Sequence, residues 1–315
     1  MKAWQFVGDG QPLTLNDVPD PEPGHGEIAI NVLAVGLCHS DVGFLSGGIP
    51  SSWLGQLPRT LGHEVAGRVT QLGEGVDEFE VGDMVAIVMR SDSAGIGRDG
   101  GYAPRAVFRT DQAVLVPAGV SATAAAAATD AGRTAVHSVK NVAGVTSATR
   151  LGIVGLGGLG LIGLQTGLAL GAEVYGAEPK EAARVRAFEL GAKAVVEDVD
   201  DLAPFELDVI VDFAGYGSTT AKALRSVRAG GTVVLVGLGR DQATINTSDF
   251  ALRGLTLKSS VTSTLEQLHE TLELIGEGKV APVTTEIGFD EIGEGIERVA
   301  RGEVIGRLVA VFPDK

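Results

Sequence analysis

A glycine motif stands near the middle of the chain, in the segment LGIVGLGGLGLIGLQTGLALGAEVYGAE at 151–178. Gly155, Gly157 and Gly160 follow an apolar run with the spacing G-x-G-x-x-G, and a helix-like stretch and a second apolar run come next. In such a unit the first glycine allows a tight turn, the second lets the backbone approach a pyrophosphate, and the third lets the helix pack on the strand. The helix N-terminus offers N–H groups to the phosphates. The spacing therefore predicts a dinucleotide site.

The acid at the end of this segment refines that prediction. Glu178 stands 23 positions after Gly155, near the spacing of about 20 at which an acid binds the ribose hydroxyls. A carboxylate there favours NAD(H) over NADP(H), because it accepts from a 2′-hydroxyl and repels a 2′-phosphate. Lys180 and Arg184 lie close enough in sequence to soften that preference.

A chance glycine-rich turn and a transmembrane helix are the alternatives to a dinucleotide site, the latter because residues 151–170 carry no charge. Seven glycines in those twenty residues, together with Gln165 and Thr166, argue against a membrane span.

A second group of polar residues lies in GLCHSD at 36–41 and GHE at 62–64. Cys38 and His63 are of types that bind zinc, but 25 positions separate them, without the short spacing of a self-contained site. Spacing alone leaves open a buried, apolar Cys38 and a hydrogen-bonded core His63.

The elements that must position these residues differ along the chain. Residues 1–120 are β-rich, with short apolar runs broken by Gly, Pro and Asp. Residues 121–141 change to an Ala-rich helix that begins at a Ser121 N-cap. From residue 150 strands and helices alternate, which predicts a parallel sheet with crossover helices. The expected strands are 151–154, 173–177, 194–196, 208–213, 232–236, 255–259 and 306–312, and the expected helices are 158–170, 180–190, 218–227, 264–276 and 290–301.

Size and composition set further limits. A chain of 315 residues suggests two domains, and a formal net charge of −15 argues against a nucleic-acid partner. The single cysteine excludes an intramolecular disulfide and an all-cysteine metal site. The N-terminus MKAWQFVGDGQ lacks a signal-peptide pattern, so we expect a cytoplasmic protein without a membrane partner.

The chain resembles the zinc-dependent alcohol dehydrogenase branch of the medium-chain dehydrogenase/reductase superfamily. The resemblance runs in order from about residue 25 to 312 through GLCHSDV, LPRTLGHEVAGRV, FEVGDMVA, DAGRTAVHS, GLGGLG, GGTVVLVG and GEVIGRLVAVF. It implies an α/β protein with a β-rich GroES-like catalytic domain at 1–130 and 264–315. A doubly wound, parallel-sheet Rossmann domain at 131–263 completes the expected architecture.

The resemblance also implies a zinc ligand set. Cys38 and His63 match the first two ligands, and Asp130 stands at the third, where a cysteine is usual. A carboxylate is an accepted zinc ligand, and one thiolate with one carboxylate still balances Zn²⁺. For Asp130 a plain helix N-terminal acid is the alternative. Ser40 matches the hydroxyl that receives the alcohol proton.

Other family positions concern the surroundings of the zinc, the cofactor and the substrate. Asp41 and Glu64 match acids that orient a ligand histidine and tune the metal. By resemblance, cofactor contacts come from His39, Gly155, Gly157, Gly158, Leu159, Gly160, Glu178 and Arg307. An apolar substrate pocket for medium-sized secondary alcohols, ketones or aldehydes is expected at Phe44, Trp53, Leu54 and Val261, the last of these from the segment 261–265. Core packing is the alternative for Phe44 and Trp53, and a surface charge for Arg307.

Two departures from the family matter. Gly43 replaces a histidine that often ends the proton relay, so the proton must leave by another route, such as ribose and water. The segment 87–102 lacks the four cysteines of a structural zinc lobe. We therefore expect one catalytic zinc and no structural zinc.

The combined prediction is an NAD(P)-dependent alcohol dehydrogenase or carbonyl reductase that transfers hydride to or from a small molecule. Zinc acts as Lewis acid, Ser40 relays the proton, and the protein forms a homodimer or homotetramer. One alternative is a zinc-free quinone or enone reductase of the same superfamily. Another is a catalytically silent NAD-binding protein.

Overall fold

The computed structural model describes residues 1–89, 92, 94–261 and 264–314, which fold into two units. The first unit comprises Met1–Asp130, Leu268–Gly276 and Thr284–Lys315, and the second comprises Ala131–Gln267 and Glu277–Val283. None of the helices in this described part of the chain has the length and apolar character needed to cross a membrane.

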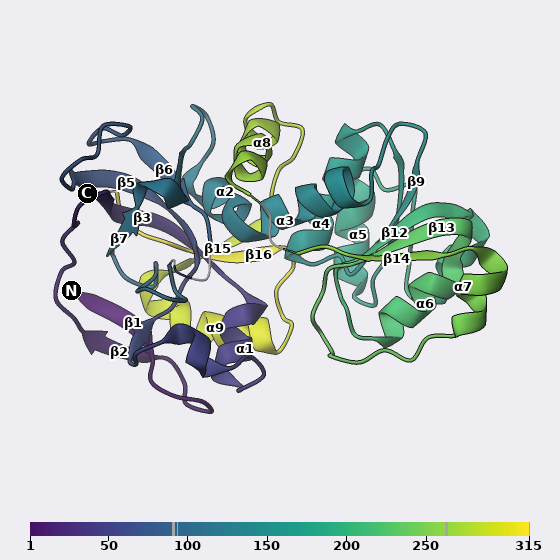
Figure 1. Ribbon diagram of the computed structural model, residues 1–315, viewed down its shortest axis with the longest axis horizontal. Helices are drawn as coiled ribbons and strands as arrows, with labels where there is room; N and C mark the ends of the chain where they lie inside the picture. The colour runs from purple at the N-terminus through teal and green to yellow at the C-terminus, as the bar shows by residue number, and fades with distance from the viewer. Residues whose placement is uncertain (90–91, 93, 262–263, 315) are drawn as a thin grey trace. The chain divides into compact units, whose positions relative to one another are not determined.

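A largely antiparallel sheet forms the centre of the first unit, with strand order β15-β16-β3-β5-β6-β8 and with β7 paired to β3. Its strands are β3 (Glu27–Leu37), β5 (Glu64–Leu72), β6 (Met84–Ile87), β7 (Arg105–Arg109), β8 (Ala113–Leu115), β15 (Thr284–Gly288) and β16 (Arg307–Val311). Figure 1 shows β16, from the end of the chain, running near β3 from its beginning. This pairing brings residues from both ends of the chain to one sheet.

Smaller elements complete the first unit. A second sheet has the order β2-β1-β4. The remaining elements are β1 (Lys2–Phe6), β2 (Thr14–Asp17), β4 (Arg59–Thr60), α1 (His39–Leu45), η1 (Ser51–Leu54), η2 (Thr110–Gln112), α2 (Ala122–Ala127), η6 (Phe289–Glu291), α9 (Ile292–Ala300) and α8 (Leu265–Gly276), most of which belongs to this unit.

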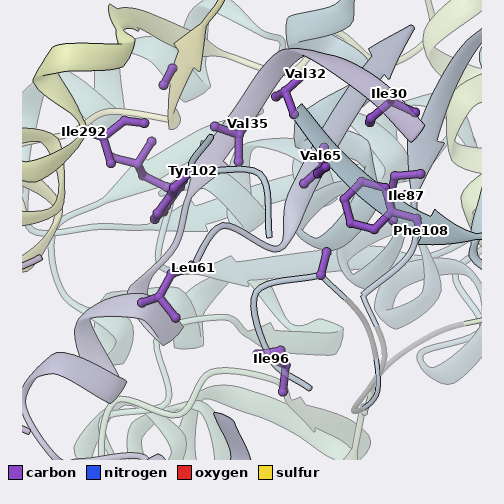
Figure 2. Close-up of a cluster of buried hydrophobic side chains, with 14 of the residues drawn as sticks. Ile30, Val32, Val35, Leu61, Val65, Ile87, Ile96, Tyr102, Phe108 and Ile292 are labelled. Atoms are coloured by element: carbon purple, nitrogen blue, oxygen red, sulfur yellow. The ribbon is translucent and has the colours of Figure 1, made fainter. Parts of the chain in front are cut away.

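Apolar side chains from the long strands make the core of the first unit. Strand β3 is buried along nearly its whole length, because its Val, Ile, Leu and Ala residues are covered on both faces. Figure 2 shows members of this core, among them Ile30, Val32 and Val35 of β3, Val65 of β5, Ile87 of β6 and Phe108 of β7. The residues that adjoin the ends of β3 and β5 are therefore attached to strands that are firmly packed in the core.

The second unit is a parallel sheet with strand order β11-β10-β9-β12-β13-β14 and helices between the strands. Figure 1 shows α6 and α7 close to β13. The elements are α3 (Arg133–Val136), η4 (His137–Val142), β9 (Arg150–Val154), α4 (Gly158–Ala169), β10 (Glu173–Ala177), α5 (Glu181–Glu189), β11 (Ala194–Val196), η5 (Val199–Phe205), β12 (Leu207–Asp212), α6 (Ser218–Ser226), β13 (Val227–Leu235), α7 (Thr247–Arg253) and β14 (Thr256–Ser259).

This strand order is that of a doubly wound sheet, in which the first strand lies at the centre and the order reverses beside it. Strand β9 is that first strand, with β10 on one side and β12 on the other. Ligands bind such sheets at the carboxyl end of the reversal point. The predicted fold class, a β-rich unit with a doubly wound parallel-sheet unit, is confirmed.

The Ala-rich helix differs from the prediction. Ser121 does cap it, because its Oγ accepts from Ala124 N at 3.1 Å. Residues 121–141 are helical as expected, but α-helical turns alternate there with two π-helical segments, η3 (Ala128–Gly132) and η4. A π-helical turn inserts one extra residue and so changes the direction in which the following side chains point.

Candidate metal and cofactor sites

Four potential metal ligands of the first unit converge: Cys38, His63, Glu64 and Asp130 have ligand atoms that all lie within 4.8 Å of one another. Cys38 follows β3, His63 and Glu64 stand at the start of β5, and Asp130 lies in the π-helical segment η3. Cys38, His63 and Glu64 are buried and Asp130 is half-buried. The structure thus brings together the three predicted ligands and both predicted neighbouring acids, since Asp41 Oδ1 lies 3.3 Å from His63 Nδ1.

Helix capping fixes Cys38. It is the N-cap of α1, and its Sγ accepts from Ser40 N at 3.5 Å. In return, Asp41 Oδ2 accepts from Cys38 N at 3.0 Å. This reciprocal arrangement is a capping box with a thiol in place of the usual hydroxyl. The chain therefore holds the sulfur in one orientation by means of the helix start itself.

His63 is fully buried between two carboxylates. Its Nδ1 faces Asp41 Oδ1 at 3.3 Å without the alignment of a hydrogen bond, and its Nε2 lies 3.8 Å from Asp130 Oδ2. Burial lowers the pKa of His63, but Asp41 and Cys38 together outweigh burial through their charges and close polar contacts, so the pKa is raised well above 6.5. Within the described residues, Nε2 has no hydrogen-bond partner.

These separations suit a zinc ion. Tetrahedral zinc with bonds of about 2.0–2.3 Å to N, O and S sets its ligand atoms about 3.3–3.6 Å apart. Asp130 Oδ2 lies 3.8 Å from both His63 Nε2 and Cys38 Sγ. A shift of a few tenths of an ångström would bring Asp130 Oδ2 to the separation that a shared zinc ion requires from each of the other two atoms. One thiolate, one carboxylate and one neutral imidazole also balance the charge of Zn²⁺, so the residues fit the metal.

Glu64 is held by Arg307 rather than pointing freely at the cluster. Arg307 donates from Nε to Glu64 Oε2 at 2.7 Å and from Nη2 to Glu64 Oε1, and both side chains are almost completely buried. Burial raises the pKa of Glu64, and the guanidinium of Arg307 opposes that rise. Gly36 makes room for the carboxylate, since a Cβ there would lie 1.9 Å from Glu64 Oε2.

Arg307 also reaches the cluster, with Nη2 at 3.7 Å from Asp130 Oδ2. Burial lowers the pKa of Arg307, but nearby negative charges, first that of Cys38 and then that of Glu64, raise it well above its ordinary value. The sequence led us to expect Arg307 at the cofactor phosphates. The structure gives it two carboxylate neighbours next to the potential metal ligands, and its contact with a cofactor stays a prediction.

The remaining predicted residues of the first unit differ in how deeply they are buried. Ser40 is half-buried, and its Oγ lies 3.6 Å from Cys38 Sγ, whereas His39 is exposed on the first turn of α1. Phe44 and Leu54 belong to the hydrophobic core, and Trp53 is 63% exposed. Their part in a substrate pocket stays a prediction.

Val261, predicted for the same pocket, is exposed in the second unit. Thr262 and Ser263, from the same predicted segment, lie outside the described residues.

Ile49 occupies the space beside Gly43, the position at which the family often has a relay histidine. A Cβ on Gly43 would lie 2.7 Å from Ile49 Cδ1. The isoleucine occupies the space that a larger side chain at position 43 would need. A larger side chain at position 43 would therefore require Ile49 to move.

The glycine loop of the second unit joins β9 to α4. Gly155 has φ +81°, a conformation that favours glycine, and its N–H donates to Ala177 O at 3.0 Å. A Cβ on Gly160 would lie 1.8 Å from Gly155 O, so α4 packs directly on the turn. Gly157, by contrast, is exposed, with nothing within 4 Å of the position of its missing Cβ. Gly158 begins α4, followed by Leu159, and both are half-buried.

This geometry fits a pyrophosphate. Gly157 is the N-cap of α4 and provides no side-chain cap, so the N–H groups of the first helical turn face the open space beside it. An anion is stabilised at such a helix end by those N–H groups and by the helix dipole.

Glu178 is anchored to the glycine loop. Its Oε2 accepts from Leu156 N at 2.8 Å and its Oε1 from Lys180 N at 3.1 Å. Each carboxylate oxygen has a second lone pair that can accept from a hydroxyl. Arg184 is turned to the backbone, donating to Glu178 O at 2.9 Å and Pro179 O at 2.6 Å.

Tyr102 is a neighbour of the four potential metal ligands that the sequence did not reveal. Its fully buried hydroxyl donates to Asp41 Oδ2 at 2.8 Å. Burial, followed by the charge of Asp41, raises the pKa of Tyr102 well above 10.0, so the hydroxyl keeps its proton. Tyr102 stands in the segment GGYAP, and nothing in the spacing of the sequence connects this segment with Asp41.

A polar cavity elsewhere in the first unit holds none of the predicted residues. It has a volume of about 830 Å³ and is lined partly by Glu27, Arg98, Arg109 and Asp111. Arg98 pairs with Glu27 at 2.5 Å and Arg109 with Asp111 at 2.7 Å. Both arginines of the lining are thus paired with carboxylates of the same lining.

Comparison with protein families gives two matches. Residues 24–118 match the alcohol dehydrogenase GroES-like domain, and residues 158–277 match the zinc-binding dehydrogenase family. Among curated proteins, an alcohol dehydrogenase of Geobacillus stearothermophilus is 30% identical over 336 aligned positions, which cover 98% of this chain and 99% of that protein.

Solved structures give the same picture. The acetophenone reductase of Geotrichum candidum NBRC 4597, in complex with NAD, is similar with a TM-score of 0.90 and 31% identity, over 99% of this chain and 97% of that one. The alcohol dehydrogenase of the archaeon Aeropyrum pernix has a TM-score of 0.90 and 28% identity, over 99% of this chain and 100% of that one.

Proposed function

Because the chain belongs to the zinc-dependent alcohol dehydrogenase branch of the medium-chain dehydrogenase/reductase superfamily, we propose that it transfers hydride between NAD(H) and an alcohol or its carbonyl partner. Cys38, His63 and Asp130 hold one catalytic zinc. The observation that carries this proposal is His63 Nε2, buried without a hydrogen-bond partner among the described residues and facing Asp130. A buried polar atom without a partner costs about 1–3 kcal/mol.

When bound, zinc supplies a Lewis acid for the substrate oxygen and NAD(H) supplies the hydride chemistry. The chain's own residues orient and balance these groups. Asp41 faces His63 Nδ1 and so favours the tautomer with the proton on Nδ1, which leaves the Nε2 lone pair for the metal. Cys38 and Asp130 provide the two negative charges.

The proton follows a separate path. Ser40 Oγ, half-buried beside Cys38, receives the proton of the alcohol in oxidation and returns it in reduction. A bound NAD(H) would supply ribose hydroxyls to take the proton on from Ser40 with water, since Gly43 has no side chain to do so.

The cofactor is bound by the glycine loop, with His39 and Arg307 as further proposed contacts. Gly157, Gly158 and Leu159, at the N-terminus of α4, would hold the pyrophosphate. Glu178 accepts from the ribose hydroxyls and favours NAD(H). The tie of Arg184 to two backbone carbonyls supports this preference, because a 2′-phosphate would have to draw that guanidinium away.

The proposed substrates are medium-sized secondary alcohols, ketones and aldehydes, bound next to Phe44, Trp53, Leu54 and Val261. A similar protein is named for its reduction of acetophenone, which supports including aromatic ketones among the substrates to be tested.

We also propose a homodimer or homotetramer. Strand β14 stands at the end of the strand order of its sheet, and Leu257 on it is 37% exposed. An unpaired strand edge is a template for a second chain. Light scattering on a size-exclusion column tests this, and a monomer at micromolar concentration contradicts it.

The test of the function starts with metal content. Protein purified without chelator is analysed by mass spectrometry, and we expect about one zinc per chain. Turnover is then measured with NAD(H) and NADP(H) on a panel of alcohols, ketones, quinones and enones. Absence of metal with reduction of enones would favour the zinc-free reductase. Binding of NADH without any turnover would favour the silent protein. An advantage of tenfold or more for NADPH in kcat/KM would refute the role of Glu178.

A further inference from the structure

The loop before β7 packs directly against the residues that lead into His63. Three backbone hydrogen bonds of 2.8–3.0 Å join residues 100–102 to residues 60–62. A Cβ on Gly100 would lie 2.3 Å from Gly62 O, so the two backbones touch. Gly62 has φ +92° and stands immediately before His63. The loop thus fixes the backbone from which the histidine side chain projects.

The same loop also reaches the other side of the histidine through Tyr102. The Tyr102 hydroxyl donates to Asp41 Oδ2 at 2.8 Å, and the same oxygen accepts from Cys38 N at 3.0 Å. With Oδ2 held by two donors, the rotation of the carboxylate is set, and Oδ1 faces His63 Nδ1 at 3.3 Å. Asp41, His63 and Tyr102 are fully buried, so water does not compete for these positions.

Resting on the zinc site proposed above, we propose that Tyr102 is a positioning residue of the metal centre. Its hydroxyl holds Asp41 in the rotation that presents Oδ1 to His63 Nδ1 and keeps Nε2 turned toward Asp130. Outer neighbours of a metal ligand act in this way, by fixing the tautomer and ring orientation of a histidine. The residue touches neither the proposed metal nor the substrate, so its effect passes through Asp41.

The ring of Tyr102 has a second role that must be separated from this one. Figure 2 shows it as part of the core of the first unit, where it packs near Leu61 and Ile292. Tyr102→Phe keeps the ring and removes only the hydroxyl. A second buried tyrosine provides a matched control: Tyr175, in the second unit, donates its hydroxyl to Glu173 at 3.1 Å. Tyr175→Phe removes the hydroxyl of a buried tyrosine that belongs to the other unit.

The experiment measures zinc release to a coloured chelator and the visible spectrum of the Co²⁺-substituted protein. We expect Tyr102→Phe to release zinc about 10-fold faster and to alter the Co²⁺ bands, while Tyr175→Phe matches the wild type. Unchanged release and an unchanged spectrum in Tyr102→Phe would overturn the proposal. Equal loss of melting temperature in metal-free and zinc-loaded Tyr102→Phe, with unchanged zinc release, would assign the hydroxyl to stability alone and overturn it too.

A double-variant cycle tests the route through Asp41. In the Asp41→Asn background, which already disturbs the contact with His63, Tyr102→Phe is expected to add less than a twofold change in zinc release. Full additivity of the two variants contradicts the proposed route. A wild-type protein that binds no zinc would instead refute the proposed function, so the two failures are distinguishable.

Discussion

The candidate metal site of the first unit is made of side chains, whereas the glycine loop of the second is made of backbone. Cys38, His63 and Asp130 come from separate parts of the chain, and each contributes one atom. The glycine loop lies in one continuous segment and acts through N–H groups and through the absence of Cβ atoms. Removing a side chain should therefore destroy the first site, while adding a methyl group should be enough to damage the second.

The largest effect is expected from Asp130→Ala. The variant removes one of two charged ligands, so we expect zinc content to fall below about a tenth per chain and kcat/KM to fall by about 10³ or more. Mass spectrometry and steady-state kinetics measure both. Asp130→Cys is the matched control, because it supplies the ligand usual at this position and should keep zinc. Full zinc occupancy in Asp130→Ala would show that Asp130 is not a ligand.

The next effect concerns the buried ion pair beside the cluster. Arg307→Met leaves Glu64 buried without its partner, which we expect to destabilise the fold by about 3–5 kcal/mol. Urea unfolding of the zinc-loaded protein measures the loss. The double variant Glu64→Gln with Arg307→Met removes both charges and should recover most of it. If the double variant were as unstable as Arg307→Met, packing and not the unpaired charge would be the cause.

The contrast between the two sites also accounts for what the sequence could predict. The glycine loop is contiguous, so strand, turn, helix and acid could be assigned from spacing, and the parallel sheet followed from the alternation of elements. Strand β15 and helix α7 were missed, because the mostly polar TTEIG and the exposed TSDFALR have no apolar pattern of their own. The π-helical turns were missed because an Ala-rich run is typical of a regular helix.

The candidate metal site depends on contacts that the local sequence does not encode. Spacing alone did not decide whether Cys38 and His63 bind a metal or belong to the core. Asp130 was identified as a candidate ligand only through the resemblance to a family. The pairing of Glu64 with Arg307 arises because β16 lies next to β3 and β3 next to β5. Such contacts between distant segments have no signature in a single sequence, which is why the contact of Tyr102 with Asp41 was also missed.

The glycine loop gives a prediction of intermediate size that separates folding from binding. In Gly160→Ala the new Cβ meets Gly155 O, so we expect a loss of about 1–3 kcal/mol in unfolding free energy. In Gly157→Ala the Cβ enters open space, so stability should change little while NADH binds at least about 10-fold more weakly. Thermal unfolding without cofactor and fluorescence titration with NADH distinguish the two. Weaker stability in Gly157→Ala with unchanged NADH binding would refute the proposed pyrophosphate position.

The smallest effect on stability is expected from an exposed ion pair of the second unit, Lys222 with Asp198, in contrast to the buried pair of Arg307 and Glu64 in the first. The hydrogen bond from the Lys222 side chain is the main cause that lowers the pKa of Asp198 below 3.8, and the hydrogen bond from Asp200 N is the next. The stabilisation is therefore present above that pH and is lost as the pH falls through the lowered pKa. Lys222→Met should cost less than about 1 kcal/mol at pH 7, because the pair is solvent-exposed. Urea unfolding at several pH values should show the deficit shrinking below pH 3.8. A deficit that stayed constant into that range would mean that Lys222 stabilises the unit by packing rather than by charge.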